Sequence, residues 1–231
     1  MIYQHQWRSG FLAITSIGIS LATLYTFIAP TAGNRPVSSF EFPDRIPLNS
    51  WQQVDSKSAI NSLFDPQKPA QESQELVQSA HDYRYSQNGS DLQVEMRYVV
   101  GTRGDVNSYL HEYTEIPPKA IESQKIEQLE GVGHYALFTS GNRAYLSSCI
   151  SPRSLSNVTQ KQFSDNRYSN DFQPQILLDW LQGTASIRDR RCLWTHLSTP
   201  ISKSDPQIAY KTLETAWIDW YQWWQPRFPT L

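Results

Sequence analysis

The stretch Asp82-Tyr-Arg-Tyr-Ser-Gln-Asn-Gly-Ser-Asp-Leu-Gln-Val-Glu-Met-Arg-Tyr-Val-Val100 decides the predicted fold. Its centre holds Asn88-Gly89, a dipeptide that suits a two-residue hairpin turn because both turn residues need positive φ. From Leu92 to Val100, apolar and polar residues alternate, which is the period of a half-buried strand. The stretch therefore predicts an antiparallel hairpin of strands 82–86 and 92–100 with one buried face.

Similar signals extend the prediction outward. A second hairpin is expected from His134–Thr139 to Ala144–Ile150, with its turn at Gly141-Asn142, and Cys192–Ser198 indicates another strand. Helical signals occupy the remaining segments. The first predicted helix covers Ala120–Glu130, and the second is capped by Thr159 and runs to Arg167. The third is an apolar stripe from Phe172 to Leu181 that ends before Gly183, and the last runs from Asp205-Pro206 to about Gln225. We expect an α+β fold, an antiparallel sheet of hairpins packed with helices.

The last of these helices gathers its aromatic residues on one side. Trp217, Trp220 and Trp224 share a face on a helical wheel, opposite Lys211 and Glu214. We first expect this face to pack on the protein's own sheet. A docking surface for a partner is the second interpretation, which makes the three tryptophans candidate partner-facing residues. A helix lying on a membrane comes third, because the polar face has a single lysine.

An uncharged stretch, Phe11 to Ala29, predicts the compartment. It has the length of a short membrane-spanning helix, so we expect a transmembrane anchor, and a signal peptide cleaved after Gly33 is the alternative. Gly18 and Ala22 lie four residues apart and would let another helix pack closely. The expected organisation is a cytoplasmic stub (1–10), the anchor (11–29), a linker (30–50) and an extracytoplasmic α+β domain (51–231). This makes the chain a single-pass protein of the inner membrane with a periplasmic domain.

Composition excludes several functions. The formal net charge is −2 and the sequence pI is near 6.2, so the chain lacks the basic surface of a nucleic-acid-binding protein. It also lacks a glycine-rich phosphate loop and the G-x-S-x-G and H-E-x-x-H motifs. We therefore expect no cofactor, no metal and no catalytic set.

The two cysteines, Cys149 and Cys192, leave three interpretations open. An even count outside the cytoplasm favours a disulfide between them. If the second hairpin keeps the register of a two-residue turn, His134 lies opposite Cys149, and His196 shares a strand face with Cys192, which would suit a Cys₂His₂ zinc site. A Cys–His nucleophile is the third interpretation. His134, His196, Arg153 and Arg191 are the expected neighbours of any such site.

Several blocks of the sequence resemble a known family. They are Phe42-Pro-x-x-Ile-Pro-Leu-x-x-Trp51, Gly133–Thr139, Arg143–Arg153, Val158–Phe163 with Asn166-Arg167, and Asp189–Ser198. Together with the N-terminal span, these blocks resemble the cyanoexosortase A system-associated proteins, small accessory proteins encoded beside an exosortase in cyanobacteria. Where that family is expected to have Asn-Pro-Arg-Gly, this chain has Ser151-Pro-Arg-Ser154.

The resemblance implies a partner. Exosortases are multi-pass membrane enzymes that are thought to cut C-terminal sorting signals, and their catalytic Cys, Arg and His belong to the enzyme itself. No residue here matches those catalytic groups. The function expected is a non-catalytic, membrane-anchored accessory protein that contacts the exosortase or its sorted substrates. The alternatives are a Cys–His hydrolase or transferase acting on sorted proteins or exopolysaccharide, and a structural or binding module of the cell envelope.

Overall fold

The computed structural model describes residues 2–28, 40–59, 76–181, 186–201 and 205–230, and the chain divides into two compact units, Met1–Pro36 and Val37–Leu231. The first unit contains the helix α1 (Ile2–Ile28). Its described large apolar side chains between Phe11 and Leu24 are exposed. Within the described residues, no helix has the combined length and hydropathy needed to cross a membrane.

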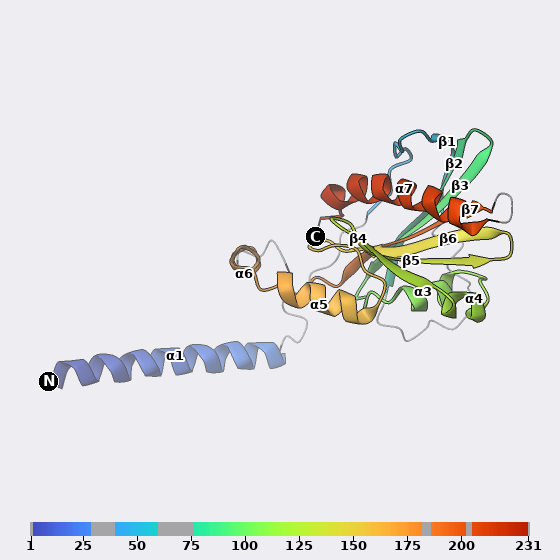
Figure 1. The fold of residues 1–231 in the computed structure, drawn as a ribbon. Coiled ribbons are helices and arrows are strands. Elements are labelled where there is room, and N and C mark those ends of the chain that lie inside the picture. The colour runs from blue at the N-terminus through green and yellow to red at the C-terminus, as the bar shows by residue number, and fades with distance from the viewer. Residues whose placement is uncertain (1, 29–39, 60–75, 182–185, 202–204, 231) are drawn as a thin grey trace. The chain divides into compact units, whose positions relative to one another are not determined.

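The second unit is built on an antiparallel sheet of seven strands within the described residues (Figure 1), in the order β1-β2-β3-β7-β6-β5-β4. The strands are β1 (Gln52–Ser58), β2 (Leu76–Gln87), β3 (Ser90–Val100), β4 (Lys125–Leu129), β5 (Gly133–Ser140), β6 (Arg143–Ile150) and β7 (Arg191–Pro200). The late strand β7 lies between the two hairpins and joins them into one sheet, because it pairs with β3 on one side and with β6 on the other.

Both predicted hairpins are confirmed. In the first, Asn88 and Gly89 have φ of 47° and 82°, the conformation that the Asn-Gly signal requires. In the second, the pairing runs from Ser140 with Arg143 to Ala136 with Ser147. The strands are longer than predicted, since β2 begins at Leu76 and β7 ends at Pro200.

The region after Pro117 differs from its prediction. A single helix was expected over Ala120–Glu130, but α4 (Pro118–Glu122) ends within two turns and β4 follows it. The strand forms because Lys125–Leu129 pairs with β5, so tertiary hydrogen bonds outweigh the local helix propensity. The helix α3 (Val106–Tyr113), capped by Asp105, had not been predicted.

The three later helices follow their sequence signals. α5 (Gln160–Asn170) begins with a capping box between Thr159 and Gln162. α6 (Pro174–Leu181) covers the predicted apolar stripe, although the expected stop at Gly183 lies outside the described residues. α7 (Pro206–Trp224) opens at the Asp205 cap and continues into a short 3₁₀ turn, η1 (Gln225–Arg227).

The sheet separates two apolar layers. On one face, α7 packs on β6 and β7 and closes the larger core with its tryptophans. On the other face, side chains from α3, α4 and α5 join the sheet in a smaller core that includes Phe138, Phe163 and Trp194. The helices thus lie on opposite sides of the sheet, as Figure 1 shows.

The domain begins earlier than predicted. Phe42, Ile46 and Leu48 are buried in the larger core, although residues 30–50 had been assigned to a linker. The Tyr83 and Tyr85 hydroxyls donate hydrogen bonds to the carbonyls of Pro43 and Ile46, which fixes this segment against β2. A stretch rich in proline and serine looks like a linker in sequence, but its scattered apolar residues are anchored by tertiary contacts.

Candidate functional site

A row of polar side chains crosses the sheet on the face opposite α7. In the strand register, Lys57 pairs with Asp82, Asp82 with Glu95, and Glu95 with His196. Directly paired residues of antiparallel strands point to the same face, so the row runs from the edge strand β1 to β7. We call Lys57, Asp82, Glu95, Arg97 and His196, together with Arg84 and Gln93 on the same face, the polar sheet face.

Arg97 is the central cation of this face and is 4% exposed. Its guanidinium donates to Asp82 Oδ1 at 2.8 Å and to Glu95 Oε2 at 3.3 Å. A buried guanidinium is stable only where carboxylates compensate its charge, and here two of them do. Its Nε is buried without a hydrogen-bond partner among the described residues. Arg97 therefore holds both carboxylates in place.

His196 lies at the inner end of the row and is 2% exposed. It stacks between aromatic rings, with centroid distances of 5.2 Å to Tyr145 and 5.6 Å to Trp194. Burial lowers the pKa of His196 to about 3, and repulsion from Arg97 and Arg143 acts in the same direction. The imidazole is therefore neutral at pH 7, and its Nδ1 has no partner among the described residues.

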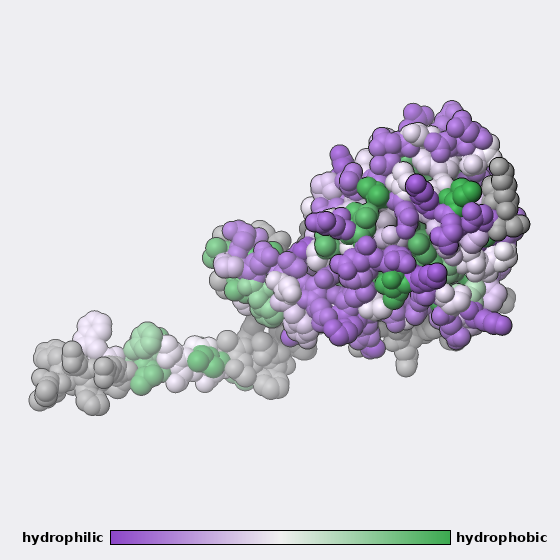
Figure 2. All heavy atoms as spheres, viewed as in Figure 1, coloured by the Kyte–Doolittle hydropathy of each residue, from purple (hydrophilic) through white to green (hydrophobic). Residues whose placement is uncertain are grey.

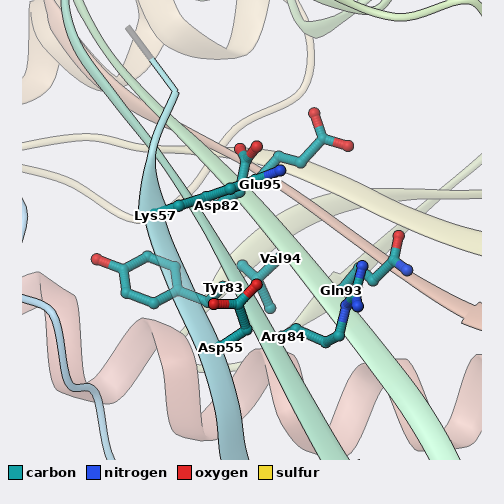
Figure 3. A pocket seen from close by; sticks show the side chains of 8 residues that line it. All are labelled: Asp55, Lys57, Asp82, Tyr83, Arg84, Gln93, Val94 and Glu95. Atoms are coloured by element: carbon teal, nitrogen blue, oxygen red, sulfur yellow. The ribbon is translucent and has the colours of Figure 1, made fainter.

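The outer part of the polar sheet face is hollowed (Figure 3). A depression of about 100 Å³ is lined by Asp55, Lys57, Asp82, Tyr83, Arg84, Gln93, Val94 and Glu95. No ion pair within 4 Å involves Lys57 or Arg84 in the described part of the chain. Burial raises the pKa of Glu95, and Arg97 opposes that rise. The depression thus offers both signs of charge, which suits a polar segment of a partner.

The predicted disulfide is present. Cys149 on β6 and Cys192 on β7 are bonded, with their Cα atoms 5.6 Å apart and both residues fully buried. They lie in the smaller core, with Phe138 and Trp194. No thiol is free, so neither a thiolate nucleophile nor a cysteine-ligated zinc site exists in this state. In the described residues, no group of three His, Cys, Asp or Glu side chains is placed to hold a metal.

The predicted register of the second hairpin holds as far as Ala136 and Ser147, but the pair predicted between His134 and Cys149 does not form. β5 and β6 separate after Ala136 and Ser147, and the segment Ser156-Asn157 enters between them. The His134 amide donates to the Ser156 carbonyl at 2.9 Å, and the Cys149 amide donates to the Asn157 carbonyl at 2.9 Å. His134 therefore does not pair with Cys149.

The two arginines expected beside the cysteines have another role. Arg191 extends to the other face of the sheet, where it binds both Asp189 oxygens and donates to the Pro229 carbonyl. Arg153 donates to Asp171 and to the carbonyls of Ser186 and Ile187. Both residues therefore join loops and the C-terminal segment, and neither makes the disulfide electropositive.

Two further sets of predicted residues are also located by the structure. Trp217, Trp220 and Trp224 are at most 1% exposed and pack in the larger core, so the first interpretation of that helix is confirmed and the partner-facing one is wrong. Gly18 on α1 is exposed, with no atom within 4 Å of an added Cβ, while the side chain of Ala22 lies outside the described residues.

Sequence reasoning missed the polar sheet face. It used Glu95 and Arg97 only as the polar residues of an alternating strand, and alternation shows only that they point away from the buried apolar face. The available signal was three polar residues at positions 93, 95 and 97, followed by a histidine on another strand. Without the order of the strands, nothing placed His196 beside Glu95.

Comparisons with protein-family models, with curated proteins and with solved structures give no match to this chain.

Proposed function

We propose that this chain is a membrane-anchored, non-catalytic accessory protein of an exosortase-type sorting system. Its α+β domain lies on the periplasmic side and contacts the membrane-integral sorting enzyme or the proteins that it sorts. The uncharged run Phe11–Ala29 is the anchor, retained in the mature protein, and the preceding stub is cytoplasmic. The sequence blocks that resemble the accessory family supply the identity of the partner.

The disulfide is the observation that supports this proposal most. Cys149 and Cys192 are fully buried and bonded inside the sheet, and structural disulfides of this kind form in oxidising compartments outside the cytoplasm. The bond also uses both thiols, so the Cys–His hydrolase or transferase has no nucleophile in the oxidised protein. An accessory role needs a binding surface rather than a nucleophile.

The polar sheet face is the proposed contact surface. The ion pairs of Arg97 with Asp82 and Glu95 fix the carboxylates. Lys57 and Arg84 make no ion pair with any residue that the structure describes, which leaves their charges for a partner. Preorganised charges favour specificity and association rate, because their geometry is set before the partner arrives. The tryptophan face of α7 is not a candidate contact surface, because it is buried in the larger core.

Site-specific photo-crosslinking in native membranes tests the proposal. A photoreactive residue replaces Arg84 on the polar sheet face in the full chain. The matched control replaces Lys211, which is exposed on the outer side of α7. We expect the Arg84 position to capture the sorting enzyme or one of its substrates, and the Lys211 position not to. Capture of neither protein from position 84 would refute the proposal.

The anchor can be tested separately. Replacing residues 11–29 by a poly-leucine span that still inserts keeps the tether but removes the small residues Gly18 and Ala22. Unchanged crosslinking from position 84 would reduce the segment to a tether. Loss of crosslinking would show that the helix itself contacts the partner.

A further inference from the structure

The exposed apolar side chains of the second unit are concentrated in one place. Ten large apolar residues are exposed in its described part, and five of them lie between residues 168 and 180. We call these five the α6 patch: Tyr168 (74% exposed), Phe172 (56%), Leu177 (37%), Leu178 (51%) and Trp180 (45%). Figure 2 shows apolar side chains at the edge of the lobe formed by α6, beside polar ones. Such a concentration marks an interaction surface.

The helix α6 exposes several of its apolar side chains. Its charged residue Asp179 is half-buried and accepts a hydrogen bond from Gln175 Nε2 at 2.8 Å, whereas Leu178 and Trp180 on either side are exposed. A helix covering a domain in water turns its apolar side chains inward. The sequence of α6 therefore fits an apolar surrounding outside the domain.

The outer surface of this segment also carries little charge. Only Asp171 and Asp179 are charged between residues 168 and 180. Asp171 is 2% exposed and bound by Arg153 and Arg167. What remains outside is the α6 patch together with the uncharged polar residues Ser169, Gln173 and Gln175. Tyr168 and Trp180 lie at its ends, and these residue types concentrate at the interface between lipid and water.

The distance between the proposed anchor and the domain restricts what can cover this surface. Eleven residues, 29–39, lie between Ile28 and the first described residue of the domain, Phe40, and a fully extended chain of that length spans at most about 40 Å. The domain therefore stays close to the bilayer. Because the tether raises the effective concentration of the lipid surface around the domain, weak contacts are enough to hold the domain on it.

We propose that the α6 patch lies on the lipid bilayer, with Leu178 and Trp180 at the level of the head groups and acyl-chain boundary. This proposal rests on the membrane anchor of the proposed function, and it adds the orientation of the domain. The patch has no exposed cation, so its contact with lipid is apolar and does not require anionic lipids.

Spin labelling of the full chain tests this. Because the two native cysteines are bonded to each other, an introduced cysteine is the only free thiol. Nitroxide labels are placed separately by Leu178→Cys and Phe172→Cys in the patch, by Ile17→Cys in the anchor, and by Ile208→Cys as the control. Ile208 is a matched control because it is 56% exposed on α7, away from the patch. The proteins are reconstituted in vesicles of phosphatidylcholine, with and without phosphatidylglycerol.

The readout is access to oxygen, which concentrates in lipid, against access to a water-soluble nickel chelate. We expect the Leu178 and Phe172 labels to lose access to the chelate in both vesicle types, and the Ile208 label to keep it. If both patch labels remain as accessible to the chelate as the Ile208 label, the proposal is overturned. The Ile17 label reports on the anchor independently, so failure of the anchor and failure of the patch give different results.

Discussion

Breaking the Cys149–Cys192 bond should destabilise the domain by a measurable and calculable amount. The bond closes a loop with a sequence separation of 43, for which the chain-entropy relation gives about 4 kcal/mol at 25 °C. In a domain of this size, 1 kcal/mol corresponds to about 2–4 °C in Tm. Reduction should therefore lower the Tm by roughly 8–16 °C.

The assay is thermal unfolding of the full chain in detergent, followed by tryptophan fluorescence, before and after reduction under mild denaturant. The control is the double variant Cys149→Ala/Cys192→Ala, whose Tm the reductant should leave unchanged. Thiol titration of the unfolded, unreduced protein should find no free thiol. Two titratable thiols before reduction, or equal Tm values for the oxidised and reduced protein, would refute the reasoning.

Three further predictions concern stability. Trp220→Ala should lower the free energy of unfolding, measured in urea, by about 3–5 kcal/mol, because the Trp220 side chain is fully buried. Trp180→Ala, at an exposed position, should change it by no more than about 0.5 kcal/mol. Equal losses for the two variants would contradict the assigned packing. The pKa of His196 is about 3 in the folded protein and ordinary in the unfolded protein, so below pH 6.5 only the unfolded state binds the proton. The free energy of unfolding should therefore fall between pH 6.5 and 3 by up to about 1.4 kcal/mol per pH unit. His196→Gln should flatten this slope relative to the parent protein, and an unchanged slope would show that the histidine is not buried in its neutral form. Gly133→Ala should destabilise the domain more than Gly131→Ala. Both glycines have positive φ, but only at Gly133 would a Cβ overlap backbone atoms of Ser156, in the segment that enters between β5 and β6. Similar unfolding midpoints for the two variants would refute this position of the segment.

Local sequence signals predicted the hairpins and the capped helices well. Asn88-Gly89 specifies its turn through backbone conformation alone, and Thr159 with Gln162 specifies a helix start through bonds within four residues. Such features depend on neighbours in sequence, so one chain suffices to predict them. The disulfide was predicted from cysteine count and the expected compartment.

Features that depend on distant pairing were not predictable in the same way. Lys125–Leu129 becomes a strand only because β5 offers a free edge. Ser156-Asn157 enters between β5 and β6, although the turn at Gly141-Asn142 by itself would let the two strands pair further. The polar sheet face required the order of the strands, which places β7 between β3 and β6. No short-range pattern contains that order.

The most direct test of the account is the side of the membrane on which the domain lies. With the native cysteines bonded, Ile208→Cys gives a single exposed thiol in the domain, and Trp7→Cys gives one in the stub, where the side chain is 80% exposed. A membrane-impermeant maleimide is applied to intact spheroplasts and to lysed cells. The account predicts that Ile208→Cys is labelled in intact spheroplasts and that Trp7→Cys is labelled only after lysis. Labelling of Ile208→Cys only after lysis would contradict it.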